Sequence, residues 1–247
     1  MLHWYICAAS WLGTVGQWFA GLVTLSAVLV ALFKDDYVRW RDRPILKATV
    51  RPGAPDCAPA VVYTSYQNTL ARADSYYVRL WVENLGKGRA EDVQVYVANL
   101  YWLDKAAGGT GSYRRVERFL PMNLSWAHSQ PNQRDIFAKG IASKMGRHCD
   151  VGHVVKPQDG EPFGLPHADA VLGACSLMLD LEAPPATGNH ILPAGTYRLE
   201  LWVAASNAER IAKFLQIKVD GRWFDDASEM FTKGLIIKQV DNPGATA

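Results

Sequence analysis

Residues 11–33 have the sequence WLGTVGQWFAGLVTLSAVLVALF, a run of 23 residues without a charged side chain. A helix of that length is roughly 34 Å long, and the hydrocarbon core of a bilayer is about 30 Å thick. Eleven of the residues are Leu, Val or Phe, which together favour insertion by roughly 3–7 kcal/mol and outweigh the amide of Gln17. The run therefore predicts a transmembrane helix. The alternative is a buried helix of a soluble protein, whose apolar run is usually only about 10–14 residues long.

The flanks of this run predict its orientation. Residues 1–10 contain no charged side chain, which favours an anchor over a cleaved signal peptide. Six basic residues follow the run within 18 positions: Lys34, Arg39, Arg41, Arg43, Lys47 and Arg51. The positive-inside rule places such a flank in the cytoplasm. We therefore expect an inner (plasma) membrane protein with its N-terminus outside and its C-terminal domain in the cytosol.

Small residues lie on one face of the predicted helix. They recur at spacings of 3, 4, 4, 3 and 4, with Gln17 beside them: Gly13, Gly16, Ala20, Thr24, Ala27 and Ala31. Such a face lets two helix backbones approach closely. It predicts a homo-oligomer formed through this helix, in addition to the contact with membrane lipid. The alternative is that Gly and Ala are simply common in membrane helices.

Pro44 disfavours helix at the residue before it, so we expect residues 1–43 to form the anchor and juxtamembrane helix, and residues 44–247 a cytosolic domain. Apolar and polar residues alternate with the period of a strand in several segments of this domain: Ile45–Arg51, Tyr76–Glu83, Glu91–Leu103, Thr196–Val203, Ile211–Val219 and Leu235–Val240. The pattern predicts a mainly β fold, an antiparallel β-sandwich with few short helices.

Other segments predict the connections. Residues 84–88, NLGKG, have turn chemistry and predict either a hairpin or a crossing between two sheets. Proline content predicts a loop over 52–59, and KAAGGTGS at 105–112 predicts a flexible loop. Residues 136–144 are expected to hold one or two helical turns. Acidic residues at the start of 225–232 predict a short helix.

The residues around the predicted turn resemble a known signature. Val82, Asn84 and Gly86, followed by Ala90 and Val93, are similar to the V-x-N-x-G-x-x-x-A-x-x-V pattern of Ig-like, CARDB-like bacterial β-sandwiches. The resemblance implies two packed antiparallel sheets, usually in adhesion or interaction modules that are mostly outside the cytoplasm. Gly195-x-Tyr197 resembles a tyrosine corner, in which the hydroxyl binds back to a loop.

The sequence offers little catalytic chemistry. One compact set of side chains has the donor types that Zn²⁺ prefers: His148, Cys149, Asp150 and His153. In a regular strand, however, His148 and Asp150 share one face while Cys149 and His153 share the other. Help from His128, His167 or Cys175, or a bend at Gly152, would be required. No nucleophile elbow, phosphate loop, dinucleotide-binding fingerprint or metalloprotease motif is present. We expect no enzyme, no cofactor and no metal site.

The net charge, the cysteine count and the tryptophans limit the classes of function that the sequence supports. A formal net charge of +2 makes a nucleic-acid partner unlikely, and four cysteines are too few for a disulfide framework. Several tryptophans could form an aromatic groove, but core filling is the more common role: Trp81, Trp102, Trp126, Trp202 and Trp223. The leading hypothesis is a membrane-anchored interaction module. The alternatives are a membrane effector of the bacterial-defence type, which senses a cytosolic ligand and oligomerises through its helix, and an envelope-side adhesion or scaffold domain.

Overall fold

The computed structural model describes the backbone of residues 2–105, 111–128 and 136–241, and their side chains except at 2–17, 39, 168 and 170. Most of the loop predicted over 105–112 lies outside these residues. The chain divides into two units, Met1–Arg43 and Pro44–Ala247. The first unit is one helix, α1 (Leu2–Arg41), of 40 residues. It ends three residues before Pro44, because a proline disfavours helical backbone at the residue before it.

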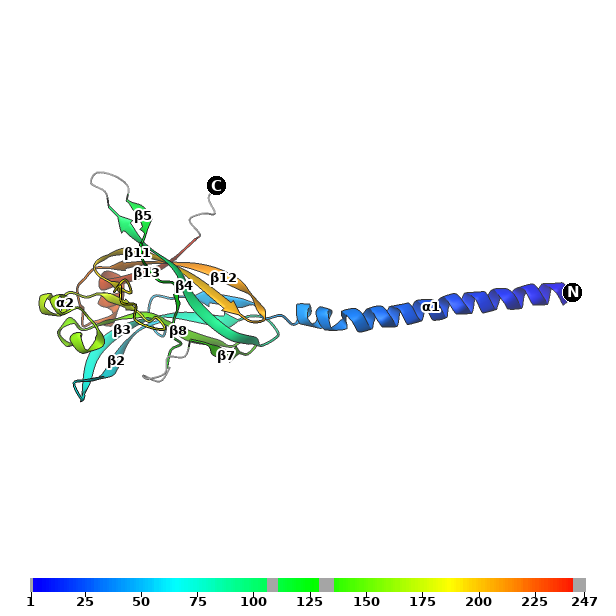
Figure 1. The fold of residues 1–247 in the computed structure, drawn as a ribbon, viewed down its shortest axis with the longest axis horizontal. Coiled ribbons are helices and arrows are strands. Elements are labelled where there is room, and N and C mark those ends of the chain that lie inside the picture. The colour runs from blue at the N-terminus through cyan, green and yellow to red at the C-terminus, as the bar shows by residue number, and fades with distance from the viewer. Residues whose placement is uncertain (1, 106–110, 129–135, 242–247) are drawn as a thin grey trace. The chain divides into compact units, whose positions relative to one another are not determined.

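The second unit is mainly β, as the alternation predicts, and its strands form two antiparallel sheets. Sheet I contains β1 (Leu46–Thr49), β2 (Cys57–Tyr66), β3 (Thr69–Asn84), β8 (Gly146–Val155), β9 (Leu177–Leu179) and β10 (Ile191–Leu192). Sheet II contains β4 (Ala90–Asp104), β5 (Ser112–Arg115), β6 (Met122–Asn123), β7 (Ala138–Ile141), β11 (Gly195–Ala205), β12 (Ala208–Val219) and β13 (Leu235–Val240). The two sheets lie as layers in Figure 1.

Sheet I has the strand order β1-β3-β8-β9-β10, with β2 also paired to β3, and sheet II has the order β13-β12-β11-β4-β5, with β6 and β7 also paired to β4. The connections hold the short helical segments η1 (Pro157–Asp159), η2 (Glu161–Phe163), α2 (His167–Leu172), α3 (Ala227–Glu229) and η3 (Met230–Gly234). The first strand was expected to begin at Ile45, and it begins one residue later, at Leu46. The loop expected over 52–59 is shorter than predicted, because β2 already begins at Cys57.

Every second side chain of the long strands enters the core between the sheets. Fully buried residues alternate along β3, β4 and β11 as the period of two requires: Val78, Leu80, Val82, Val93, Val95, Val97, Leu199, Leu201 and Val203. All belong to one hydrophobic cluster. Tyr197 follows the same face, and its hydroxyl donates to the carbonyl of Pro193 at 3.1 Å. This is the local bond that the tyrosine-corner resemblance predicts.

Asn84 holds the point where the chain crosses from sheet I to sheet II. Its buried side chain accepts hydrogen bonds from the amides of Ile45 (3.1 Å) and Gly86 (2.9 Å). It donates to the carbonyls of Gly88 (2.7 Å) and Ile141 (3.1 Å). One carboxamide thus connects the segment before β1, the β3–β4 turn and β7. The alternative left open by the sequence is resolved: residues 85–89 are a crossing between sheets and not a hairpin.

The prediction of helical turns over 136–144 is wrong. Residues 138–141 form β7, which pairs antiparallel with the start of β4 at Ala90–Val93. The apolar spacing of this segment suits a helix, but the unpaired amides and carbonyls at the start of β4 require a strand partner. The short helix predicted over 225–232 is present, and the side chain of Asp226 accepts the amide of Glu229 at 2.8 Å as an N-cap.

Replacing Asn84 tests this crossing. Asn84→Ala leaves four backbone groups without their partner, of which the Ile141 and Gly86 groups are buried and the Ile45 and Gly88 groups half-buried, so the free energy of unfolding should fall by about 2–4 kcal/mol. Urea unfolding of the full chain in non-ionic detergent, followed by tryptophan fluorescence, measures it. Asn99→Ala is the matched control, since that half-buried amide makes one bond, to Glu200 at 2.7 Å, and should cost only about 0.5–1.5 kcal/mol. Equal losses in the two variants would contradict a special role for Asn84.

Candidate functional site

Three features of the described residues are candidates for function: the apolar helix, a row of charged side chains on sheet I, and a pocket beside Trp223. Within α1, the segment Trp18–Val38 is long and apolar enough to span a membrane, and none of it is buried. Its large apolar side chains are exposed, for example Trp18 at 72% and Val23 at 67%. Water solvates such a surface poorly, so this segment is suited to an apolar medium.

The predicted small-residue face lies on this helix. Ala20, Thr24, Ala27 and Ala31 are all exposed. The Thr24 hydroxyl donates to the carbonyl of Ala20 at 2.9 Å, within the helix. Gly13, Gly16 and Gln17 lie in α1 as well, but their side chains are outside the described set. The face therefore has the small side chains that close packing needs.

The structure changes the arrangement expected for the possible metal ligands. The pairing of β3 with β8 shifts register between Val78 and Arg79, which leaves Val151 as an extra residue in β8. Such a bulge reverses the alternation beyond it. His153 therefore lies on the same outer face as His148 and Asp150, and the expected split of these residues between two faces is wrong. Only Cys149 points into the core, with its thiol 3.3 Å from the carbonyl oxygen of Ser125.

Gly152 is required beside this bulge. A Cβ atom at that position would lie 2.5 Å from the carbonyl oxygen of Met178, in the neighbouring strand β9. The backbones of β8 and β9 therefore approach too closely for any other residue.

The outer face of sheet I carries a row of three pairs, which we name the outer ladder. Its members are Asp56 with His148 (3.1 Å), Arg79 with Asp150 (3.0 Å), and Asp180 with His153 (3.0 Å). Two aromatic rings of β3 cover the imidazoles. Trp81 lies 4.7 Å from the ring centre of His148, and Tyr77 stacks on His153 at 4.9 Å.

The ladder is only slightly exposed to solvent, and this governs its charges. Burial, reinforced by the nearby charge of Asp180, raises the pKa of Asp150 from 3.8 to about 6, despite the ion pair with Arg79. Asp56 has the opposite balance. Burial alone would raise its pKa, but hydrogen bonds from Arg51 and His148 bring it below the ordinary value. Protonation in acid therefore removes a stabilising carboxylate charge at Asp56 and a destabilising one at Asp150.

Each ladder side chain is already engaged by a partner of its own. Among the described residues no three His, Cys, Asp or Glu side chains are grouped so as to hold a metal ion. His167 lies near Glu161 at an exposed position, and burial raises the pKa of Cys175 to about 12. The arrangement can hold charge on a sheet surface, and it offers no activated nucleophile among these residues.

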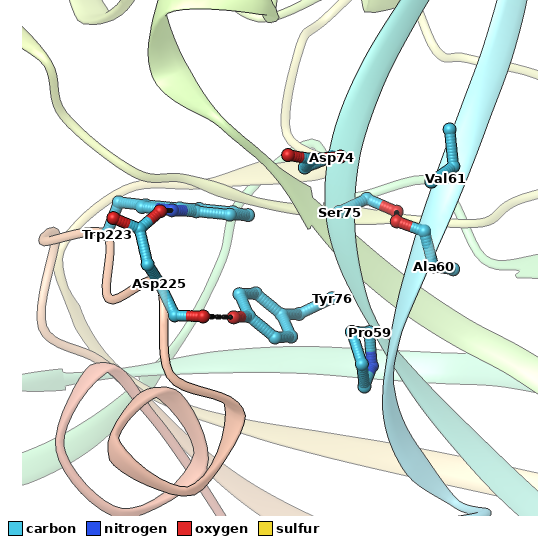
Figure 2. Close-up of a pocket in the computed structure, with 8 residues that line it drawn as sticks. All are labelled: Pro59, Ala60, Val61, Asp74, Ser75, Tyr76, Trp223 and Asp225. Atoms are coloured by element: carbon cyan, nitrogen blue, oxygen red, sulfur yellow. Dashed lines mark hydrogen bonds between the residues drawn. The ribbon is translucent and has the colours of Figure 1, made fainter.

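A pocket of about 290 Å³ lies beside the end of this sheet. Figure 2 shows Trp223 and Asp225 on one side of it and strand residues 59–61 and 74–75 on the other. The hydroxyl of Tyr76 donates to the backbone carbonyls of Phe224 (3.1 Å) and Asp225 (2.9 Å), which fixes the loop over the strands. Sequence reasoning missed this site because its parts are about 150 positions apart and share no motif.

The tryptophans do not line one groove. Trp126 is fully buried in the core and donates to the carbonyl of Ile136 at 3.2 Å, which is the core-filling role. The others lie at separate places: Trp81 in the outer ladder, Trp223 at the pocket, Trp202 under Arg210 on sheet II, and Trp102 exposed at the end of β4.

No protein-family model, curated protein or solved structure matches this chain.

The raised pKa of Asp150 gives a prediction for stability. A folded-state pKa of about 6 means that the folded protein holds this proton more tightly than the unfolded chain, so Asp150 destabilises the fold increasingly between pH 4 and 6. Asp150→Asn should therefore gain stability relative to the parent by about 2–3 kcal/mol as the pH rises from 4 to 7.

Urea unfolding of the full chain in detergent, at a series of pH values, measures that difference. Asp56→Asn is the control of opposite sign. The pKa of Asp56 is lowered, so the stability it contributes is present at neutral pH and lost in acid, and the deficit of this variant should shrink as the pH falls. A difference for Asp150→Asn that stays constant with pH would contradict the assignment.

Proposed function

We propose that this chain is a single-pass, membrane-anchored β-sandwich interaction module, with α1 in the bilayer and residues 44–247 in the cytosol. One observation carries the proposal: the exposed apolar surface of Trp18–Val38. Each large apolar side chain left in water forgoes roughly 1.5–3 kcal/mol of burial. A bilayer removes that cost along the whole segment.

The orientation rests on charge. The basic residues that follow the span lie on the domain side, and such residues are retained in the cytoplasm. The thiols of the domain agree with this side of the membrane. Cys57, Cys149 and Cys175 are free and buried, as expected where thiols stay reduced. An envelope-side adhesion domain would need the opposite orientation.

The role as an interaction module rests on the resemblance to Ig-like, CARDB-like sandwiches, which we also propose. The geometry supports it at several signature positions. Val82, Ala90 and Val93 are fully buried in the core, and Asn84 accepts the amide of Gly86 within the turn.

A fluorescent protein that matures only in the cytoplasm, fused after residue 247, tests anchoring and orientation together. The proposal predicts a fluorescent membrane fraction that resists an alkaline carbonate wash. Leu25→Arg with Leu29→Arg should move the fluorescence into the soluble fraction, because each Arg at the centre of a span costs about 2.5–3.5 kcal/mol. Soluble fluorescence from the parent would exclude the anchor. A dark fusion, with activity only from a periplasmic reporter, would exclude the cytosolic orientation.

We also propose that the helix pairs with a second copy through its small-residue face. Gly16→Ile with Ala20→Ile places two bulky side chains on that face. Crosslinked dimers in membranes should fall at least several-fold. Leu22→Ile with Leu25→Ile, on another face of α1, is the control, because it introduces the same side chains without adding bulk, and it should leave crosslinking unchanged. Equal crosslinking by both double variants would contradict pairing through this face.

A further inference from the structure

The pocket beside Trp223 has a fixed apolar floor. Two register pairs of the β2–β3 ladder face the pocket with their side chains, Pro59 with Tyr76 and Val61 with Asp74, and the pair between them, Ala60 with Ser75, has its side chains on the opposite face. The Ser75 hydroxyl is already bonded to the carbonyl of Ala60. The floor therefore offers hydrocarbon surface to a ligand, with a carboxylate at one end.

The opposite wall is aromatic and acidic. The rings of Trp223 and Tyr76 lie 4.8 Å apart between centres. The indole Nε1 of Trp223 donates to the Asp225 carboxylate at 2.9 Å, which holds the ring and the carboxylate together, as Figure 2 shows. An aromatic face beside a carboxylate is the arrangement that attracts organic cations.

The wall already holds one cation of this chain. The Lys156 ammonium lies 3.0 Å from the Asp225 carboxylate and 5.9 Å from the centre of the Trp223 ring. The hydrogen bond and charge of Asp225, with the charges of Asp74 and Asp159, raise the pKa of Lys156. Lys156 thus shows that Trp223 and Asp225 together hold an ammonium group.

The pocket region holds more carboxylates than the one that pairs with Lys156. The pKa of Tyr76 is raised first by burial and then by the charges of Asp225, Asp226 and Asp74, so three carboxylates lie near its hydroxyl. Asp74 is exposed, and among the described residues its carboxylate makes no ion pair. A second positive charge would be attracted here.

We propose that this pocket binds a guanidinium or alkylammonium group, with its cationic head between Asp74 and the Trp223–Asp225 wall and its alkyl part on Pro59 and Val61. The group comes either from a small free amine or from a basic side chain of a protein partner. Lys156 competes for the same wall. This site is independent of the membrane anchor, and its test does not depend on the outcome of the anchoring experiment.

The test uses the full chain in non-ionic detergent, labelled with 5-fluorotryptophan. The ¹⁹F resonance of Trp223 is assigned as the one missing from Trp223→Phe. Ethylguanidinium chloride, added at constant ionic strength, should shift this resonance to saturation, with a dissociation constant on the order of 1 mM. Ethylurea, which has nearly the same shape and no charge, should not produce a saturable shift.

Two variants with opposite expected effects separate binding from damage to the fold. Asp74→Asn should weaken binding about fivefold, through loss of one partly screened ion pair. Lys156→Gln should tighten it at least about twofold, because the competing ammonium is gone, and a misfolded protein would not bind more tightly. Asp92→Asn and Lys238→Gln remove the same charges from exposed sites on β4 and β13 and should change nothing.

The source of the cation is tested with N-acetylarginine amide. If the group belongs to a protein partner, this blocked residue should bind at least as tightly as ethylguanidinium. Weaker binding of the blocked residue assigns the pocket to a small free amine. A shift that is linear in ethylguanidinium, or equal for ethylurea, or unaltered in both Asp74→Asn and Lys156→Gln, would overturn the proposal.

Discussion

The sandwich depends on satisfying buried backbone groups where the chain leaves one sheet for the other. At that point Asn84 is completely buried, and its side chain serves two amides and two carbonyls at once. A neutral carboxamide is the side chain that both accepts and donates two hydrogen bonds. A carboxylate in its place would face two carbonyls, and a hydroxyl could not reach all four groups. The backbone of Asn84 adds to the same junction through Met145 and Lys144.

The two faces of sheet I are stabilised by different interactions. The inner surface is hydrocarbon and is stabilised by burial, whereas the outer surface carries the ladder pairs, in which Arg79 compensates the Asp150 carboxylate and the imidazoles of His148 and His153 are hydrogen-bonded to Asp56 and Asp180. Charged pairs that are largely removed from water contribute little net stability, but removal of one partner is costly. Acidic side chains recur at both the ladder and the Trp223 pocket: those of the ladder are each paired, and those at the pocket include the exposed carboxylate of Asp74.

Much of this fold follows from period-two alternation and from composition. The long strands β3, β4, β11 and β12, the apolar helix with its end near Pro44, and the short helix within 225–232 could be predicted because each depends on residues close in sequence, whereas the ten-residue strands β2 and β8 were not predicted. β7 could not, because its conformation is decided by unpaired groups on β4. The Val151 bulge and the pocket between β2, β3 and residues 223–225 also depend on partners distant along the chain. Tertiary contacts, rather than local propensity, determine those parts.

The outer ladder also has a consequence for how this sequence changes over generations. The Asp150 carboxylate is largely buried and Arg79 is its ion-pair partner, so a substitution at Arg79 alone leaves an uncompensated ion on the sheet. Descendant sequences should therefore alter these positions jointly, swapping both charges or losing both. Substitutions in β3 and β8 would then be correlated among related sequences, whereas residues on the outer face of a sheet usually change independently.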